Sequence, residues 1–137
     1  MKKITKTLVA ILLIAILSMA SVTAFANDNA ISPRLSHTDS AQFSFAATSS
    51  GGHFDVTYYG YDSFVRADLT VKIEKSFLLF WWTEVDTWSG SCTDLDGEFY
   101  DTIPLNGSGK YRATLTLKIT GNDGTVDTIE RQIESKY

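Results

Sequence analysis

The chain has 137 residues, one cysteine and a formal net charge of −4, from 12 basic and 16 acidic residues. An acidic chain offers no basic face to neutralise phosphates, which argues against nucleic-acid binding and against electrostatic adhesion to anionic lipid. A lone cysteine excludes an intramolecular disulfide.

The first 26 residues have the pattern of a secretory signal peptide. Three lysines in the first six residues precede an unbroken apolar run from Leu8 to Leu17, and Ala24-Phe25-Ala26 places small residues where a signal peptidase reads them. The run is too short to span a bilayer of about 30 Å. We expect cleavage after Ala26, no membrane insertion afterwards, and a secreted, extracellular product. Residues 27–137 then carry nine basic and 16 acidic residues, a net charge of −7.

The mature chain begins with a polar segment and then alternates in period two. Residues 27–39 contain Pro33 and lack periodicity, so we expect a flexible lead-in. From residue 40, apolar and polar residues alternate as they do in half-buried strands. In the clearest strand, every second residue from Val65 to Ile73 is expected on the inner face and Glu74 on the wet face. The pattern predicts strands at 40–47, 54–58, 65–74, 81–88, 98–105, 111–119 and 126–135.

Seven short strands without a helical repeat indicate an all-β domain over residues 40–137, a two-sheet antiparallel sandwich. The motif Gly109-x-Tyr111-x-Ala113 resembles the strand-F pattern of immunoglobulin-like domains, with Ala113 where antibody domains have a cysteine. The resemblance implies an immunoglobulin-like fold in which the Tyr111 hydroxyl bonds back across a corner. It also places Trp81 or Trp82 at the core tryptophan of strand C.

A wider similarity concerns export. The signal peptide, the spacing Trp82-x-x-Val85-x-x-Trp88 and a Gly-rich hairpin after Arg112 resemble small secreted β-rich proteins of Gram-positive bacteria whose function is unknown. This resemblance implies export and a β-fold, and it supplies no site residues.

The aromatic residues of strand 81–88 are the main binding signal. Alternation places Trp82, Glu84, Asp86 and Trp88 on one face, opposite Trp81. If Trp81 joins the core, a tryptophan pair flanked by acids faces solvent, where it could stack on sugar rings or anchor a protein. Two alternatives stay open: a bulge could move one tryptophan to the other face, or residues 77–80 could cover the pair.

No catalytic constellation is visible. His37 and His53 are expected to be solvated surface residues, and no G-x-S-x-G elbow occurs. Glycoside hydrolysis needs two carboxylates facing each other across a cleft. Candidates by number alone are Glu84, Asp86, Glu98 and Asp101.

The segment after strand 81–88 reads as a polar, acidic loop. Asp94, Asp96 and Glu98 match part of a calcium loop, but the remaining ligands are missing, so we expect no metal and no cofactor. Cys92 lies in this predicted loop. It either pairs with a second chain, giving a disulfide-linked dimer, or packs as a small buried residue.

These patterns predict a secreted noncatalytic interaction module. Its partner would be an unknown protein or an extracellular surface component such as a glycan, bound through the exposed aromatic face. The alternatives are a carbohydrate-binding module, a toxin or bacteriocin-like effector, and a small secreted hydrolase.

Overall fold

The computed structural model describes residues 35–137, so the expected signal peptide and most of the lead-in lie outside the described residues. All seven expected strands are present. They are β1 (Thr38–Thr48), β2 (Gly51–Gly60), β3 (Phe64–Phe77), β4 (Trp81–Cys92), β5 (Asp96–Ile103), β6 (Lys110–Gly121) and β7 (Val126–Lys136). No helix long and apolar enough to cross a bilayer occurs among residues 35–137.

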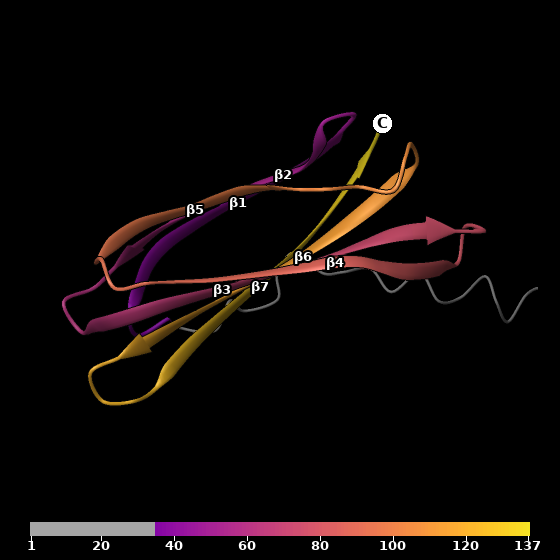
Figure 1. Ribbon diagram of the computed structural model, residues 1–137. Coiled ribbons are helices and arrows are strands. Elements are labelled where there is room, and N and C mark those ends of the chain that lie inside the picture. Colours follow the sequence, from indigo (N-terminus) through magenta and orange to yellow (C-terminus); the bar gives the residue numbers. More distant parts are fainter. Residues whose placement is uncertain (1–34) are drawn as a thin grey trace, which may run out of the picture. The chain divides into compact units, whose positions relative to one another are not determined.

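The strands form two antiparallel sheets that face each other (Figure 1). One sheet has the order β1-β2-β5 and the other β4-β3-β6-β7. Immunoglobulin-type sandwiches likewise pair the second strand with the fifth and group the third, sixth and seventh. Here the fourth strand pairs with β3, at the edge of the larger sheet. The expected two-sheet antiparallel sandwich is confirmed.

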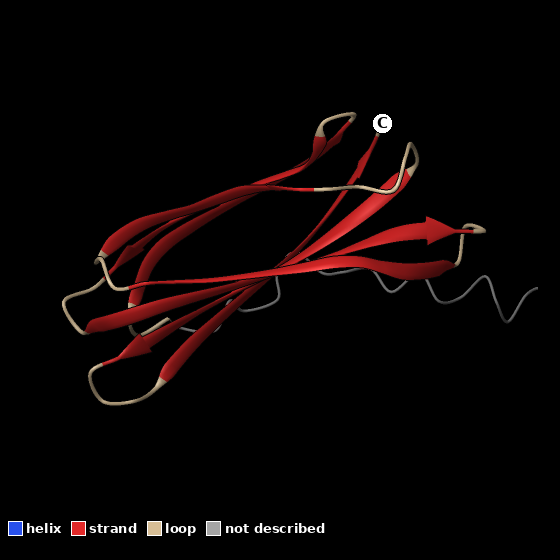
Figure 2. Cartoon of the chain, in the orientation of Figure 1, coloured by secondary structure: helices blue, strands red, loops and turns tan. Residues whose placement is uncertain are grey.

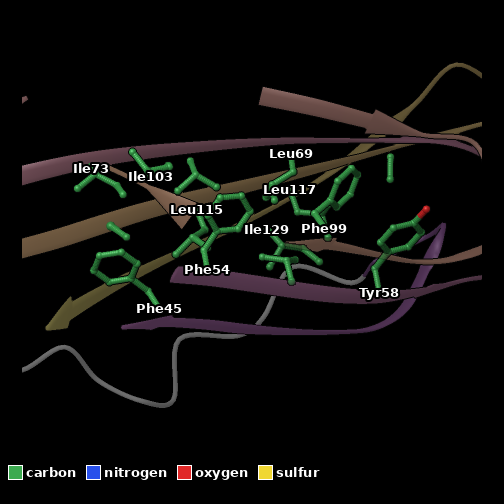
Figure 3. Close-up of a cluster of buried hydrophobic side chains, with 14 of the residues drawn as sticks. Phe45, Phe54, Tyr58, Leu69, Ile73, Phe99, Ile103, Leu115, Leu117 and Ile129 are labelled. Carbon is green, nitrogen blue, oxygen red and sulfur yellow. The ribbon is translucent and has the colours of Figure 1, made fainter. Parts of the chain in front are cut away.

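The core lies between the sheets and comes from every second residue of the central strands. Figure 3 shows Phe54, Leu69, Leu115 and Leu117 among the side chains that meet there. Each inner side chain of β3 from Ala67 to Ile73 is at most 1% exposed. Removing apolar area from water is the main favourable term in folding, at roughly 25 cal/mol per Å². The alternation that predicted the strands therefore also predicts most of the core.

Two details of β3 differ from the expectation. The pairing of β3 with β6 shifts register between Phe64 and Arg66, so Val65 bulges outward and is exposed, whereas Phe64 packs on Tyr58. Glu74 was expected to be solvated on the outer face. It does lie on that face, opposite to Ile73, but it is only 8% exposed, and Arg112 and Lys72 compensate the charge of its carboxylate.

The corner expected at Tyr111 is present. The Tyr111 hydroxyl donates to the Gly107 carbonyl at 2.5 Å, and its buried ring stacks on Tyr137 at 6.1 Å between centroids. This is the backward hydrogen bond of the immunoglobulin-type tyrosine corner. It fixes the 104–109 connection between β5 and β6.

The core tryptophan expected on the third strand is absent. Trp81 and Trp82 belong to β4, which is the fourth strand and not the third. Trp81 is exposed, and Trp82 lies half-buried on the outer side of the sheet. That part of the immunoglobulin resemblance is wrong, because the third strand ends before both tryptophans.

The described domain starts earlier than expected. His37 and Thr38, placed in the flexible lead-in, are both buried against Asp127 of β7. The Asp127 carboxylate accepts hydrogen bonds from the backbone N–H groups of Ser36 and His37 and from the Thr38 hydroxyl. Burial alone would raise the pKa of Asp127, but these hydrogen bonds outweigh it and lower the pKa.

His37 was expected to be a solvated histidine, and it is 3% exposed. Its Nδ1 lies 2.7 Å from the Ser63 hydroxyl and its Nε2 lies 2.6 Å from the Thr125 hydroxyl. A Cβ at Gly121 would fall 2.1 Å from the ring, so only glycine leaves room for the imidazole. His37 therefore ties the start of β1 to the β2–β3 and β6–β7 turns.

Candidate binding surface

The hairpin between β3 and β4 extends beyond the rest of its sheet. β6 pairs with β3 only as far as Lys75, opposite Tyr111. Ser76 and Phe77 pair with β4 alone. In Figure 2 the turn that joins these strands projects from one end of the sandwich. The last part of the hairpin is therefore a two-stranded projection with no third strand paired beside it among the described residues.

Five consecutive apolar residues occupy the end of this projection. Residues 77–81, Phe-Leu-Leu-Phe-Trp, are each between 61% and 87% exposed. We call these five residues the hairpin tip. Single exposed apolar residues are common on protein surfaces, whereas contiguous exposed apolar patches mark interaction sites.

The turn within the hairpin tip has an unfavourable backbone for its sequence. Leu78 and Leu79 have φ angles of 50° and 67°. This left-handed region costs a residue with a Cβ about 1–2 kcal/mol, and turns that need it usually contain glycine or asparagine. Leu78 and Leu79 therefore adopt a backbone conformation that glycine or asparagine would adopt at lower cost.

Aromatic and cationic groups surround the base of the hairpin tip. The Arg112 guanidinium lies 4.3 Å from the centre of the Trp82 ring, and the Lys110 ammonium lies 5.8 Å from it. Lys75 donates to the Asn106 carbonyl and forms no ion pair among residues 35–137. Cation–π contacts of this kind hold a tryptophan ring against the sheet.

Two carboxylates neutralise part of this positive charge. Glu74 accepts hydrogen bonds from Arg112 Nε at 3.0 Å and Nη2 at 2.7 Å. Burial would raise the pKa of Glu74, but the hydrogen bonds from Arg112 and Lys72 lower it overall. Glu134 pairs with Lys110. Lys75 and Lys136 are the cations near the hairpin tip that form no ion pair within the described part of the chain.

Acidic residues gather at the opposite end of the sandwich. The turns there join β2 to β3, β4 to β5 and β6 to β7 (Figure 1). They and the adjoining strand ends contain Asp39, Asp62, Asp94, Asp96, Asp123 and Asp127. These six aspartates lie at the end of the sandwich away from the hairpin tip.

The four residues expected to share one aromatic face are divided between two faces. Ile73 pairs with Asp86 and Glu74 pairs with Glu84, so Val85 is an extra residue in β4. This bulge leaves Trp82 and Glu84 on the outer face and turns Asp86 and Trp88 to the inner side. The prediction that Trp82 and Trp88 share the outer face is therefore wrong. The bulge in this strand, which the sequence left open as an alternative, places the two tryptophans on opposite faces.

Trp88 closes the open edge of the core between β4 and β5. Its ring lies 4.8 Å from Phe54 and 6.1 Å from Phe99 between centroids. Its indole N–H donates to Asp101 at 2.9 Å. A Cβ at Gly90 would lie 2.4 Å from the indole, so the absence of a side chain there makes room for the ring.

The three acids of the partial calcium loop lie around the start of β5. Asp94 and Asp96 flank the start of β5, and Glu98 lies within it. Repulsion from the Asp55 carboxylate, together with a hydrogen bond to it, raises the pKa of Glu98. No group of three or more His, Cys, Asp or Glu residues that could hold a metal occurs in the described range.

Cys92 is the last residue of β4, whereas the sequence placed it in a loop. It is half-buried and packs against the core, with its thiol 3.6 Å from Asp94 Oδ2. The disulfide-linked dimer stays a prediction.

A shallow hollow lies on the smaller sheet. It has a volume of about 500 Å³ and is lined by residues of β1, β2 and β5, among them Ser44, His53, Asp55 and Tyr100. Tyr100 is 72% exposed. His53 is held by the hydroxyls of Ser50 and Thr102, at 2.9 and 2.7 Å. Sequence reasoning did not single out this sheet face.

Comparisons with known proteins supply no family. No protein-family model matches the chain, and no curated relative matches it. Among solved structures, the chain is similar to the crystal structure of Spo0M, a sporulation control protein from Bacillus subtilis, with 11% identity and a TM-score of 0.42. The match covers 75% of this chain and 51% of that one, so the chain spans about half the length of that protein. A likeness at this level carries no argument about function.

Proposed function

We propose that the protein is a secreted noncatalytic interaction module that attaches to a surface component outside the cell through the hairpin tip. The observation that carries the proposal is the exposure of five consecutive apolar residues, 77–81, on a turn whose two leucines have positive φ. A sequence chosen for folding alone would place asparagine or glycine in that turn and keep its apolar residues inside. The signal-peptide pattern of residues 1–26 supports export.

The test replaces the two strained leucines with residues that suit the turn. Leu78→Asn together with Leu79→Gly removes apolar surface and relieves the backbone, so loss of binding cannot be attributed to unfolding. The full chain is expressed with its own N-terminal segment, and the exported product is mixed with cell-envelope fractions and sedimented. We expect the double variant to lose at least tenfold in envelope binding.

A matched control removes exposed apolar surface at the other end of the sandwich. Val65 and Val126 are 48% and 50% exposed, and both lie far from the hairpin tip along the strands. The variant Val65→Thr with Val126→Thr is expected to bind envelopes as the unmodified protein does. Equal binding by the hairpin-tip variant would show that the hairpin tip is not the attachment surface.

Carbohydrate binding is a second candidate, supported by the hollow on the smaller sheet. Tyr100 presents an exposed ring there, beside the Asp55 carboxylate and the His53 imidazole. Aromatic rings stack on sugars while neighbouring polar groups bond to hydroxyls. Under this candidate, Tyr100→Ala abolishes polysaccharide binding, whereas Tyr61→Ala, which removes an exposed tyrosine from a turn outside the hollow, leaves it unchanged.

A further inference from the structure

We propose that the surface which the hairpin tip enters is a lipid bilayer carrying anionic headgroups. This inference rests on the proposed function and names its target. From the apex toward the sandwich, apolar residues are followed by tryptophans and then by cations of the hairpin and of the neighbouring strand β6: Leu78–Phe80, then Trp81 and Trp82, then Lys75, Lys110 and Arg112. A bilayer presents the complementary layers in the same order, as hydrocarbon, an interfacial belt that favours tryptophan, and headgroups.

The length of the projection suits shallow insertion. Trp82 is three residues from Leu79, which corresponds to about 7–10 Å along a strand. Interfacial elements bury their apolar side about 5–10 Å into the boundary between headgroups and acyl chains. Within the turn, the Phe80 N–H already donates to the Leu78 carbonyl at 2.8 Å, which reduces the number of backbone groups left without a partner in lipid.

Local charge is compatible with this target although the mature chain is acidic. β3 has 14 residues, so its two ends are about 40 Å apart. Charges in physiological salt are screened beyond about 8 Å, so the aspartates at the opposite end have little effect at the hairpin tip. Lys136 and Lys75, whose ammonium donates to the Asn106 carbonyl and lies 5.5 Å from the centre of the Tyr111 ring, are the cations on this side that no carboxylate within residues 35–137 neutralises. The acidic end then orients the domain away from the membrane.

This local view leads to a proposal that differs from the expectation based on net charge alone, and the vesicle experiment decides between the two. The excess of acidic residues in the sequence argued against adhesion to anionic lipid. That argument used the net charge of the whole molecule and not the positions of the charged residues. Six aspartates lie at one end of the strands, whereas Lys75 and Lys136, which form no ion pair within residues 35–137, lie toward the other end. Adhesion depends on the charges within a Debye length of the contact, not on their sum.

The experiment uses vesicles of two compositions and the exported product of the full chain. One set is phosphatidylcholine alone, and the other contains one quarter phosphatidylglycerol. Binding is followed by flotation and by tryptophan emission, and brominated acyl chains report the depth of the quenched tryptophans. We expect saturable binding to the anionic vesicles, a blue shift, and shallow quenching that disappears in the Leu78→Asn, Leu79→Gly variant.

A charge variant tests the headgroup contribution separately. Lys75→Gln should weaken binding to the anionic vesicles about fivefold, since a lysine near an anionic surface contributes about that factor. Lys118→Gln, on β6 toward the acidic end, is the matched control and should bind normally. Equal binding to both vesicle compositions would overturn the anionic-headgroup part of the proposal.

Failure of the lipid proposal is distinguishable from failure of the proposed function. If envelope fractions bind in a manner that depends on the hairpin tip but neither vesicle composition binds, the target is another surface component and the bilayer inference is wrong. If the chain forms dimers that depend on the hairpin tip and ignores vesicles, a second copy covers the hairpin tip and the bilayer inference is again wrong.

Discussion

The indole of Trp88 lies 4.8 Å from the phenyl ring of Phe54, centroid to centroid, and so joins β4 of one sheet to β2 of the other. The same indole reaches Asp101 of β5 through its N–H. Trp88 thus closes the core at the edge where β4 and β5 lie next to each other without pairing. Trp81, seven positions earlier, contributes nothing comparable because it is exposed.

Replacing these two tryptophans should therefore have different effects on stability. We expect Trp88→Ala to lower the free energy of unfolding by about 2–4 kcal/mol, because a large half-buried ring is lost from the core. Trp81→Ala should change it by less than about 0.5 kcal/mol. Guanidinium chloride unfolding monitored by circular dichroism measures both. Equal losses of unfolding free energy in the two variants would contradict the placement of Trp88 against the core and of Trp81 in the exposed hairpin tip.

The turn substitution used to test binding also predicts a gain in stability. Leu78→Asn with Leu79→Gly removes two left-handed leucines, and we expect the free energy of unfolding to rise by about 1–2 kcal/mol. The midpoint of denaturant unfolding reports the change. A lower midpoint would mean that the two leucines stabilise the hairpin, and that their exposure is not a cost to the fold.

Asp127 should be essential for holding the first strand. Its carboxylate accepts three hydrogen bonds from residues 36–38. Asp127→Ala leaves the buried donors of His37 and Thr38 without a partner, and we expect the free energy of unfolding to fall by about 2–4 kcal/mol. Limited proteolysis should then cleave near residue 37 sooner than in the unmodified protein. Asp62→Ala, an exposed turn residue, is the control and should leave the cleavage rate unchanged.

Stability should fall on acidification. The folded-state pKa values of Asp127 and Glu74 are lowered, so each carboxylate stabilises the fold fully above its ordinary pKa. That contribution is lost as the pH falls through the lowered folded value. We expect urea midpoints to be similar at pH 7 and pH 6 and to fall progressively below about pH 4.5. In Asp127→Asn the decline should be shallower, and an identical decline would assign the acid sensitivity elsewhere.

Export predicts a defined mature N-terminus. Mass spectrometry of the protein collected outside the cell should give a chain that begins at Asn27. Ala26→Asp should block cleavage and retain the longer chain with the cells. Collection of an uncleaved chain from the medium would contradict the signal-peptide interpretation.

The strands were predictable because burial on one face leaves a period-two pattern, as in β3 and β6. The face to which each aromatic residue of β4 points could not be predicted in the same way. A single bulge at Val85 changes the face of every residue that follows it. A bulge depends on the partner strand and leaves no mark in the sequence of β4 itself.

The hairpin tip and the burial of His37 were missed for different reasons. The run Phe77–Trp82 reads as core material, and its distinguishing signal is that it spans a turn with no Gly, Asn or Pro in it. His37 depends on Asp127, which lies 90 residues away in the sequence. Contacts between residues so far apart follow from the sheet order, which local patterns do not specify.

Tyr137 is integrated into the fold, and this determines how the protein should be handled. Its backbone exchanges two hydrogen bonds with Gly109, at 3.0 and 3.3 Å, and its ring stacks on Tyr111. An affinity tag or fluorophore fused directly after Tyr137 would emerge beside the tyrosine corner, at the same end of the sandwich as the hairpin tip. Immobilisation on a sensor through that position would crowd the surface under study. Attachment ahead of Leu35 puts the linker at the acidic end and presents the hairpin tip to the analyte.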